Sequence, residues 1–395
     1  MIYLDNGATT FPKPEVVYQA MDTFARTGAV NAGRGAYAAA RAADQMIKNV
    51  RTGLISLMDA REQAQVVLTP SVTIALNQII YGQAWTENSI AYVSPYEHNS
   101  VLRPLDVLSK KIGFQVLELP LAEDLSIDLA KTAAMFEENP PSFVAVTAVS
   151  NVTGYILPHR EIFRLARRYG AFNLLDGSQA VGLIRLPFAQ TMADAICFAG
   201  HKTLYGPFGI AGFLIKNSAK LQVTLAGGTG TKSEDLAMPT SLPGSMEAGS
   251  KDTVAIAGLE AALKWLPSVK PLEHECAMVA HFIEEAGKID GVELYCAPGG
   301  LQNQAGVVSF GVRGFKAIEV AAILDNKYDI AVRAGHHCAA LIHQHLGSNK
   351  YAGTVRVSPG YFNTMEDIEV LLIALRNLDR SQLEGVADDI LRGAC

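Results

Sequence analysis

Four histidines and one cysteine fall within the fifteen residues RAGHHCAALIHQHLG, from Arg333 to Gly347. Such a cysteine could bind a metal, attack a substrate as a thiolate, or fill space in a core. A zinc site would need ligands such as His336, His337 and Cys338 to face the same side. Adjacent histidines at a strand end point to opposite faces, and the segment has neither C-x-x-C nor H-E-x-x-H spacing. The segment therefore disfavours a metal, and it leaves a nucleophilic thiol and an inert buried thiol open.

A lysine follows an apolar run in ICFAGHKTLYGPFGIAG, which begins at Ile196. The run predicts a buried strand ending near Gly200, and the Gly206–Pro207 pair predicts a turn. A lysine buried there costs desolvation energy unless it is paired, or neutral and reactive. The alternative is a lysine whose stem lies along the surface with its ammonium in water. A reactive Lys202 would need an aldehyde partner, for which pyridoxal phosphate (PLP), held as a Schiff base, is the usual candidate.

PLP has three further needs, and the sequence offers a candidate for each. Asp176, after the apolar FNLL, could keep the ring nitrogen protonated, and His98, in SPYEHNS, could stack on the ring and carry protons. Ser71, Val72 and Thr73 begin a predicted helix whose free N–H groups could hold the phosphate. Taken singly, a turn-capping aspartate, a loop histidine and a helix cap explain these residues better. Their occurrence at successive strand ends of one α/β domain favours a common site.

Short apolar runs alternate with helix-like segments from about Val66 onward. This alternation predicts a mostly parallel sheet sandwiched by helices. A Gly/Ser/Thr-rich stretch at 226–250 interrupts it, which we interpret as a functional or interface loop. The pattern then resumes in a smaller unit. We predict a large α/β domain over 16–256 and a small C-terminal α/β domain over 257–395, joined by the N-terminal segment 1–15.

Length and composition indicate a globular enzyme, with 395 residues that are 49% hydrophobic and 18% charged. A net charge of −6 provides no basic field for nucleic acid or an anionic membrane. We see no signal peptide and no apolar run long enough to span a membrane. The five cysteines are scattered, without a C-x-x-C pair, which favours reduced thiols in a cytoplasm.

Eight short motifs, taken in their order along the chain, resemble those of the cysteine desulfurases, which are class V aminotransferases of PLP fold type I. They are LDNGATT, EHNS, SNVTG, DGSQA, GHK, EAGS, RAGHHCA and VRVSPGYFN. The resemblance extends from Tyr3 to about Leu378. It implies an enzyme that converts L-cysteine to L-alanine and transfers the sulfur to its own cysteine as a persulfide.

The loop around Cys338 lacks a long Gly/Ser insertion, so it resembles the branch that hands sulfur to an acceptor protein and includes selenocysteine lyase-like proteins. A selenocysteine lyase acting on L-selenocysteine is therefore one alternative. Another is a class V aminotransferase, which would not need Cys338. A PLP-binding or metal-binding module without turnover is the alternative outside the enzymes, and intact Lys202, Asp176 and Arg356 argue against the PLP-binding form.

The resemblance also implies roles for individual residues. Lys202 is the Schiff-base lysine, and Asp176 pairs with the pyridinium nitrogen. His98 stacks on the ring and transfers protons, while Cys338 is the nucleophile. The other implied cofactor contacts are Gln179 at the phenolic oxygen, Asn151 at the ring face, and His201, Ser71, Val72, Thr73 and Ser250 at the phosphate. The implied substrate contacts are Arg356 at the carboxylate, Asn151, Ala8 and Arg34.

The chain departs from the family pattern around the phosphate. The departures are Ser71 and Ile74 where the family has Gly and Glu, Ala199 where it has a serine, and Ser250 where it has a threonine. In the family this last residue reaches the phosphate across a dimer interface, so the resemblance implies a homodimer. We expect PLP to bind through backbone N–H groups, His201 and Thr73.

Overall fold

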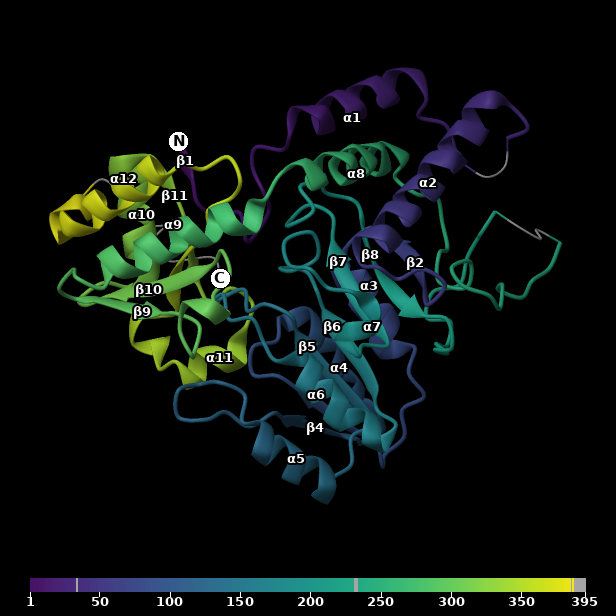
Figure 1. Ribbon diagram of the computed structural model, residues 1–395, viewed down its shortest axis with the longest axis horizontal. Helices are drawn as coiled ribbons and strands as arrows, with labels where there is room; N and C mark the ends of the chain where they lie inside the picture. The colour runs from purple at the N-terminus through teal and green to yellow at the C-terminus, as the bar shows by residue number, and fades with distance from the viewer. Residues whose placement is uncertain (33–34, 231–233, 385, 387–395) are drawn as a thin grey trace.

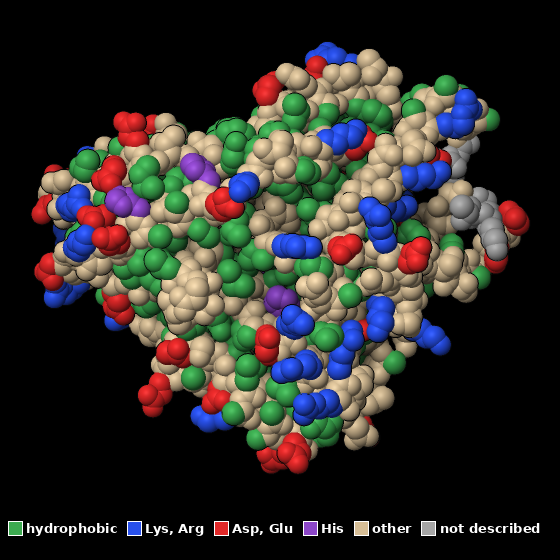
Figure 2. All heavy atoms as spheres, in the orientation of Figure 1, with side chains coloured by type: hydrophobic (Ala, Val, Ile, Leu, Met, Phe, Trp, Pro, Cys, Tyr) green, Lys and Arg blue, Asp and Glu red, His purple; other side chains and the backbone are tan. Residues whose placement is uncertain are grey.

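The computed structural model of the protein describes residues 1–32, 35–230, 234–384 and 386. Arg34, which the family resemblance places at the substrate, lies outside the described residues. Figure 1 shows a larger lobe built around a central sheet and a smaller lobe beside it. No helix in the described ranges is long and apolar enough to cross a membrane. Charged side chains of both signs are spread over the face shown in Figure 2.

The larger lobe contains a seven-stranded sheet with the strand order β2-β8-β7-β6-β5-β3-β4. Neighbouring strands are parallel except at β8, which is antiparallel to both β2 and β7. The strands are β2 (Ala64–Thr69), β3 (Ile90–Val93), β4 (Gln115–Glu118), β5 (Phe143–Thr147), β6 (Phe172–Asp176), β7 (Ala195–Ala199) and β8 (Ala211–Lys216).

Successive residues of these strands face opposite layers, as a side-chain period of two requires. In β2, Val66 and Leu68 belong to one core cluster and Val67 to another. In β5, Val144 and Phe143 divide between the same two clusters. Because both faces are covered, the strands read as continuous apolar runs rather than alternating ones. The predicted α/β fold with a mostly parallel sheet is confirmed.

Helices connect the strands and cover both faces of the sheet. The connecting helices are α3 (Val72–Tyr81), α4 (Asn99–Ile112), α5 (Leu129–Glu138), α6 (His159–Ala166) and α7 (Phe188–Thr191). Three further helices, α1 (Glu15–Thr27), α2 (Ala38–Leu57) and α8 (Thr253–Trp265), pack together, with α1 and α2 both against α8. Figure 1 shows this group at the upper right of the larger lobe.

The smaller lobe contains a four-stranded antiparallel sheet, ordered β12-β13-β10-β9. Its strands are β9 (Val292–Tyr295), β10 (Val308–Val312), β12 (Arg333–Gly335) and β13 (Thr354–Val357). Its helices are α9 (Pro271–Ala286), α10 (Ala317–Tyr328), α11 (Ala340–His345) and α12 (Met365–Arg376). A separate core of its own lies between this sheet and helices α9, α10 and α12.

The chain begins in the smaller lobe and then crosses to the larger one. Strand β1 (Ile2–Tyr3) pairs in parallel with β11 (Ile330–Ala331), and α1 of the larger lobe begins at Glu15. The residues between them therefore run along the junction of the lobes, as Figure 1 shows. The boundary predicted between 16–256 and 257–395 falls inside α8, which packs against α1 and α2 of the larger lobe, so the chain crosses to α9 of the smaller lobe only after this helix ends.

Candidate active site

The carboxyl ends of β2, β3, β5, β6 and β7 lie at one edge of the large sheet, because these strands all run in the same direction. Each strand ends at or just before a residue that the sequence analysis assigned to the site. In chain order these residues are Thr73, His98, Asn151, Asp176 and Lys202. Ligands of α/β proteins bind at this edge. The topology thus brings the predicted cofactor residues to one place.

Lys202 follows β7, and its side chain is largely surrounded by protein but still partly accessible. Burial lowers its pKa to about 8, while the negative charge of Asp176 acts in the opposite direction. Its Nζ makes no hydrogen bond or ion pair within the part of the chain that the structure describes. A buried amine that is partly neutral near neutral pH can attack an aldehyde. The environment therefore favours a reactive lysine over one that reaches into solvent.

Asp176 ends β6 and is held from one side only. Its Oδ1 accepts hydrogen bonds from the Ser178 N–H at 3.0 Å and the Ser178 hydroxyl at 2.5 Å. Its Oδ2 has no such partner among the described residues, so it can accept from a protonated ring nitrogen. Glu97 lies nearby, and burial raises the pKa of this carboxyl to about 8. Glu97 is then neutral at pH 7 and leaves the negative charge to Asp176.

His98 caps α4 in a fixed orientation. Its Nδ1 accepts the backbone N–H of Ser100 at 3.1 Å, which places the proton of the neutral ring on Nε2. Burial lowers its pKa to about 4, and the charge of Lys202 adds to this effect. The charges of Lys202 and Asp176 both act on the pKa of His98. A neutral imidazole in this fixed orientation is suited to stack on the ring of a cofactor held between Lys202 and Asp176.

Arg356 is almost fully buried on β13, with 2% of its side chain exposed. Its Nη2 lies 2.5 Å from Oδ1 of Asp5, and its Nη1 donates to the Asn151 carbonyl at 3.1 Å. Its Nε is buried without a partner in the described chain. The sequence analysis did not anticipate that Asp5 neutralises this guanidinium. The free Nε remains available to an incoming carboxylate.

Arg333 was also missed as a site residue, although it opens the histidine-rich segment. It lies opposite Arg356 in the β12–β13 register and is exposed. Its charge lowers the pKa of both His98 and Lys202. A second cation close to these groups adds to the positive potential that an anion would meet there.

Cys338 lies in a turn that follows β12. It lines a groove together with His98 and Thr73, and residues of α3 and α4 form the walls. Its carbonyl accepts the backbone N–H of Asn99 at 2.6 Å. The thiol residue therefore sits beside the histidine that also senses Lys202. Among the described residues, no group of three or more His, Cys, Asp or Glu is arranged to hold a metal ion.

Comparison with known proteins identifies the family of this chain. The chain matches the aminotransferase class-V family over residues 2–371. It belongs to the cysteine desulfurase family. A probable cysteine desulfurase of Methanothermobacter thermautotrophicus is 31% identical over 94% of this chain and 92% of its own length. One of Xylella fastidiosa is 32% identical over 95% of this chain and 90% of its own length. The apo structure of the Thermococcus onnurineus cysteine desulfurase superimposes with a TM-score of 0.88 at 28% identity, covering 96% of this chain and 95% of that one.

Within this family, which depends on PLP, the described residues fit the cofactor. Besides the free Lys202 amine and Asp176 Oδ2, His201 has a buried Nδ1 without a partner in the described chain. Its ring stacks on Phe208 at 4.5 Å, next to Lys202. An unused polar nitrogen at that position suits a phosphate oxygen. The predicted contact of His201 with the phosphate, which matters because Ala199 lacks a hydroxyl, is compatible with this unpaired nitrogen and stays a prediction.

Of the other predicted cofactor residues, Ser71 has a partner within the protein, whereas Ser250 is exposed. Ser71 Oγ accepts the Ile74 N–H at 3.3 Å and so caps α3, with Val72 as the first residue of the helix. Ser250 is exposed and lines a different cavity from that of Cys338. The predicted contact of Ser250 with the phosphate across a dimer interface stays a prediction.

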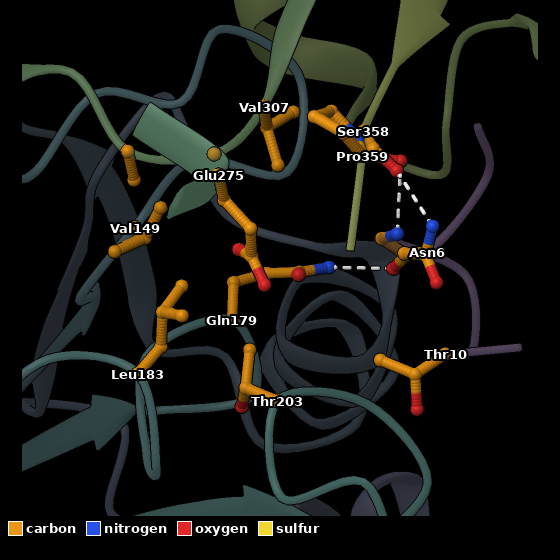
Figure 3. A pocket seen from close by; sticks show the side chains of 13 residues that line it. Asn6, Thr10, Val149, Gln179, Leu183, Thr203, Glu275, Val307, Ser358 and Pro359 are labelled. Carbon is orange, nitrogen blue, oxygen red and sulfur yellow. Dashed lines mark hydrogen bonds between the residues drawn. The ribbon is translucent and has the colours of Figure 1, made fainter. Parts of the chain in front are cut away.

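Gln179 borders a small cavity between the lobes, shown in Figure 3. Its Nε2 donates to the carbonyl of Gly7 at 2.8 Å, beside Ala8. In Figure 3 the amide of Gln179 points toward the backbone beside Asn6, where the dashed line marks its bond to Gly7. Burial raises the pKa of Glu275 to about 8, and Tyr205 donates to its Oε1 at 2.9 Å. Glu275 is therefore largely neutral at pH 7 and adds little negative charge to this cavity.

The N-terminal segment holds the backbone just before Lys202, a contact that no sequence signal indicated. The carbonyl oxygen of His201 accepts from Thr9 Oγ1 at 2.9 Å, Thr10 N at 3.1 Å and Lys13 Nζ at 2.7 Å. Burial lowers the pKa of Lys13 to about 7. These donors fix the peptide that precedes Lys202.

Proposed function

We propose that the protein is a PLP-dependent cysteine desulfurase, which converts L-cysteine to L-alanine and takes up the sulfur on Cys338 as a persulfide. The observation that carries this proposal is the position of His98. Its pKa responds to Lys202, Asp176 and Arg356, and its ring lines the same groove as Cys338. One histidine therefore links the cofactor residues, the carboxylate-binding arginine and the thiol.

PLP, when bound, supplies an electron sink for bond breaking at the carbon atoms of the substrate. The protein supplies the proton transfers and the charge around it. Lys202 Nζ, with its pKa near 8, can accept the α-proton of the substrate and return it. Asp176 Oδ2 keeps a proton on the ring nitrogen. The ring of His98 covers the site and can exchange a proton at Nε2.

Arg356 and Arg333 supply the positive charge for the substrate carboxylate. Arg356 offers its free Nε and shares its Nη2 with Asp5. A carboxylate held at Arg356 would lie near the turn of Cys338, because Asn151 connects Arg356 with that turn. Ala8 follows Gly7, whose carbonyl accepts from Gln179, and its contact with the substrate is part of this proposal.

Cys338 accounts for the fate of the sulfur. As a thiolate it attacks the sulfur atom of cysteine, the bond between that sulfur and the β-carbon breaks, and the β-carbon gains a proton. Cysteine and a thiol thus become alanine and a persulfide. We also propose a homodimer in the cytoplasm, with the persulfide passed to an acceptor protein, for example for iron–sulfur cluster assembly.

Replacing Arg356 by lysine is expected to raise the KM for cysteine by about tenfold or more, with a smaller change in kcat. Lysine keeps the charge but cannot pair with Asp5 and a carboxylate in the planar geometry of a guanidinium. Steady-state kinetics of alanine formation measure this split. Arg313→Lys is the matched control, because Arg313 forms an exposed ion pair with Asp290. A KM unchanged from the parent would remove Arg356 from substrate binding.

The function itself is tested by incubating the purified holoenzyme with L-cysteine and a thiol and measuring alanine and sulfide. We expect the two products in equal amounts. Parallel reactions with L-selenocysteine, and with a 2-oxo acid as amino acceptor, distinguish the alternatives. Activity confined to selenocysteine would identify a selenocysteine lyase. Formation of a new amino acid from the 2-oxo acid, without sulfide, would identify an aminotransferase.

A further inference from the structure

Two hydrogen bonds hold the turn of Cys338 against the larger lobe. Asn151 Nδ2 donates to the carbonyl of His337 at 2.7 Å, and the backbone N–H of Asn99 donates to the carbonyl of Cys338 at 2.6 Å. Both donors follow strands of the large sheet, whereas both acceptors follow β12 of the small sheet. The position of the thiol relative to the large-lobe residues Lys202 and His98 therefore depends on these contacts.

The turn needs such support because of its backbone conformation. His337 and Cys338 both have positive φ angles, 49° and 57°. Two consecutive residues with side chains rarely adopt this left-handed conformation, and it persists only where surrounding contacts impose it. Here the contacts fall on the two carbonyl groups of the same two residues. The hydrogen bonds from Asn151 and Asn99 therefore restrain the two residues that have the strained backbone conformation.

Asn151 is fixed from its other end as well. It is 8% exposed, and its own carbonyl accepts from Arg356 Nη1 at 3.1 Å. On the opposite side of the turn, His337 Nε2 lies 2.9 Å from Oγ1 of Thr354, two residues before Arg356 on β13. One asparagine therefore joins the guanidinium of Arg356 to the backbone that carries the thiol.

We propose that Asn151 is a positioning residue for Cys338, in addition to any contact with the cofactor or substrate. Its amide holds the His337 carbonyl, which keeps the turn closed and the thiol in the groove beside His98. The assignment of a reactive role to this thiol rests on the proposed function. Loss of the amide donor would leave Asn99 as the only large-lobe residue bonded to the turn in the described chain, and the thiol would move toward solvent.

The test measures the alkylation rate of Cys338 by iodoacetamide in the PLP-free protein, read by mass spectrometry of the Cys338 peptide. Asn151→Asp keeps the shape of the side chain but places a carboxylate against the His337 carbonyl. We expect alkylation about threefold to tenfold faster than in the parent, as the loss of one hydrogen bond allows. Asn326→Asp is the matched control, because the exposed Asn326 amide bonds only its own helix, and it should alkylate like the parent.

Thr354→Val provides a second, nearly isosteric variant should Asn151→Asp fail to fold. It removes the hydroxyl at His337 Nε2, and we expect a smaller acceleration in the same direction. Circular dichroism and the Tm of each variant establish that it is folded. Parent-like alkylation in both variants would overturn the proposal and leave Asn151 as a cofactor or substrate ligand alone.

Alkylation of the PLP-free protein requires neither cofactor nor turnover, so it is independent of desulfuration. If the parent holoenzyme forms no alanine from cysteine, the proposed function fails while the alkylation result still decides the role of Asn151. If alanine forms and Asn151→Asp lowers its rate without changing alkylation, only the positioning role is lost.

Discussion

The Lys202→Ala protein is expected to lack the absorbance of PLP bound through an amine, at roughly 420 nm, and to lose cysteine turnover by at least a factor of about a thousand. Lys202 lies at the sheet edge beside Asp176. Its pKa is lowered to about 8, and its Nζ has no partner in the part of the chain that the structure describes. Without this amine, the protein loses both the covalent anchor and the group placed to move the α-proton. Absorbance spectra of the dialysed protein with added PLP measure the first loss.

Lys13→Ala is the sharpest control for that experiment. Lys13 also has a lowered pKa, about 7, but its amine already donates to Thr10 Oγ1 and the His201 carbonyl, both at 2.7 Å. We expect this variant to keep the absorbance band. If the absorbance band persisted in Lys202→Ala and vanished in Lys13→Ala, Lys13 would be the lysine that binds PLP.

The strands that carry the site could be predicted from the sequence because burial on both faces leaves a strong signal. Runs such as AICFA in β7 are entirely apolar, and the residues that follow them reach the same sheet edge. The antiparallel direction of β8 could not be predicted, because a buried strand has the same composition in either direction. Helices α1 and α2 were missed as well, since the predicted alternation began only at Val66.

The individual cofactor residues could be predicted from the sequence, but the hydrogen bonds and ion pairs between them could not. Asp5 and Arg356 are 351 residues apart in the chain, and Asn151 and His337 are 186 apart. No local pattern encodes such pairs, because the first forms only when β13 meets the N-terminal segment, and the second only when the turn after β12 meets the segment after β5. A role for Asn151 at the cofactor or substrate can be inferred by resemblance, whereas its bond to the turn of Cys338 is visible only in three dimensions.

Cys338→Ser is expected to keep the PLP absorbance and to reduce sulfide release from cysteine by at least about a thousandfold. The oxygen of serine fits the same turn, but its hydroxyl is a far weaker nucleophile than a thiolate and cannot store sulfur as a persulfide. The cofactor residues Lys202 and Asp176 are untouched by the change. Absorbance and sulfide assays on the same preparation separate the two effects.

Cys276→Ser serves as the matched control for this experiment, because Cys276 is another partly buried thiol outside the groove. Burial raises its pKa to about 11, and its Sγ donates to the Gln304 carbonyl at 3.4 Å, so it has little thiolate character. This variant should release sulfide at the parental rate. Undiminished sulfide release by Cys338→Ser would mean that sulfur leaves without a protein persulfide. The hydrogen bonds from Asn151 and Asn99 would then hold a turn without a catalytic thiol, and the groove beside His98 would admit an external thiol to the substrate directly.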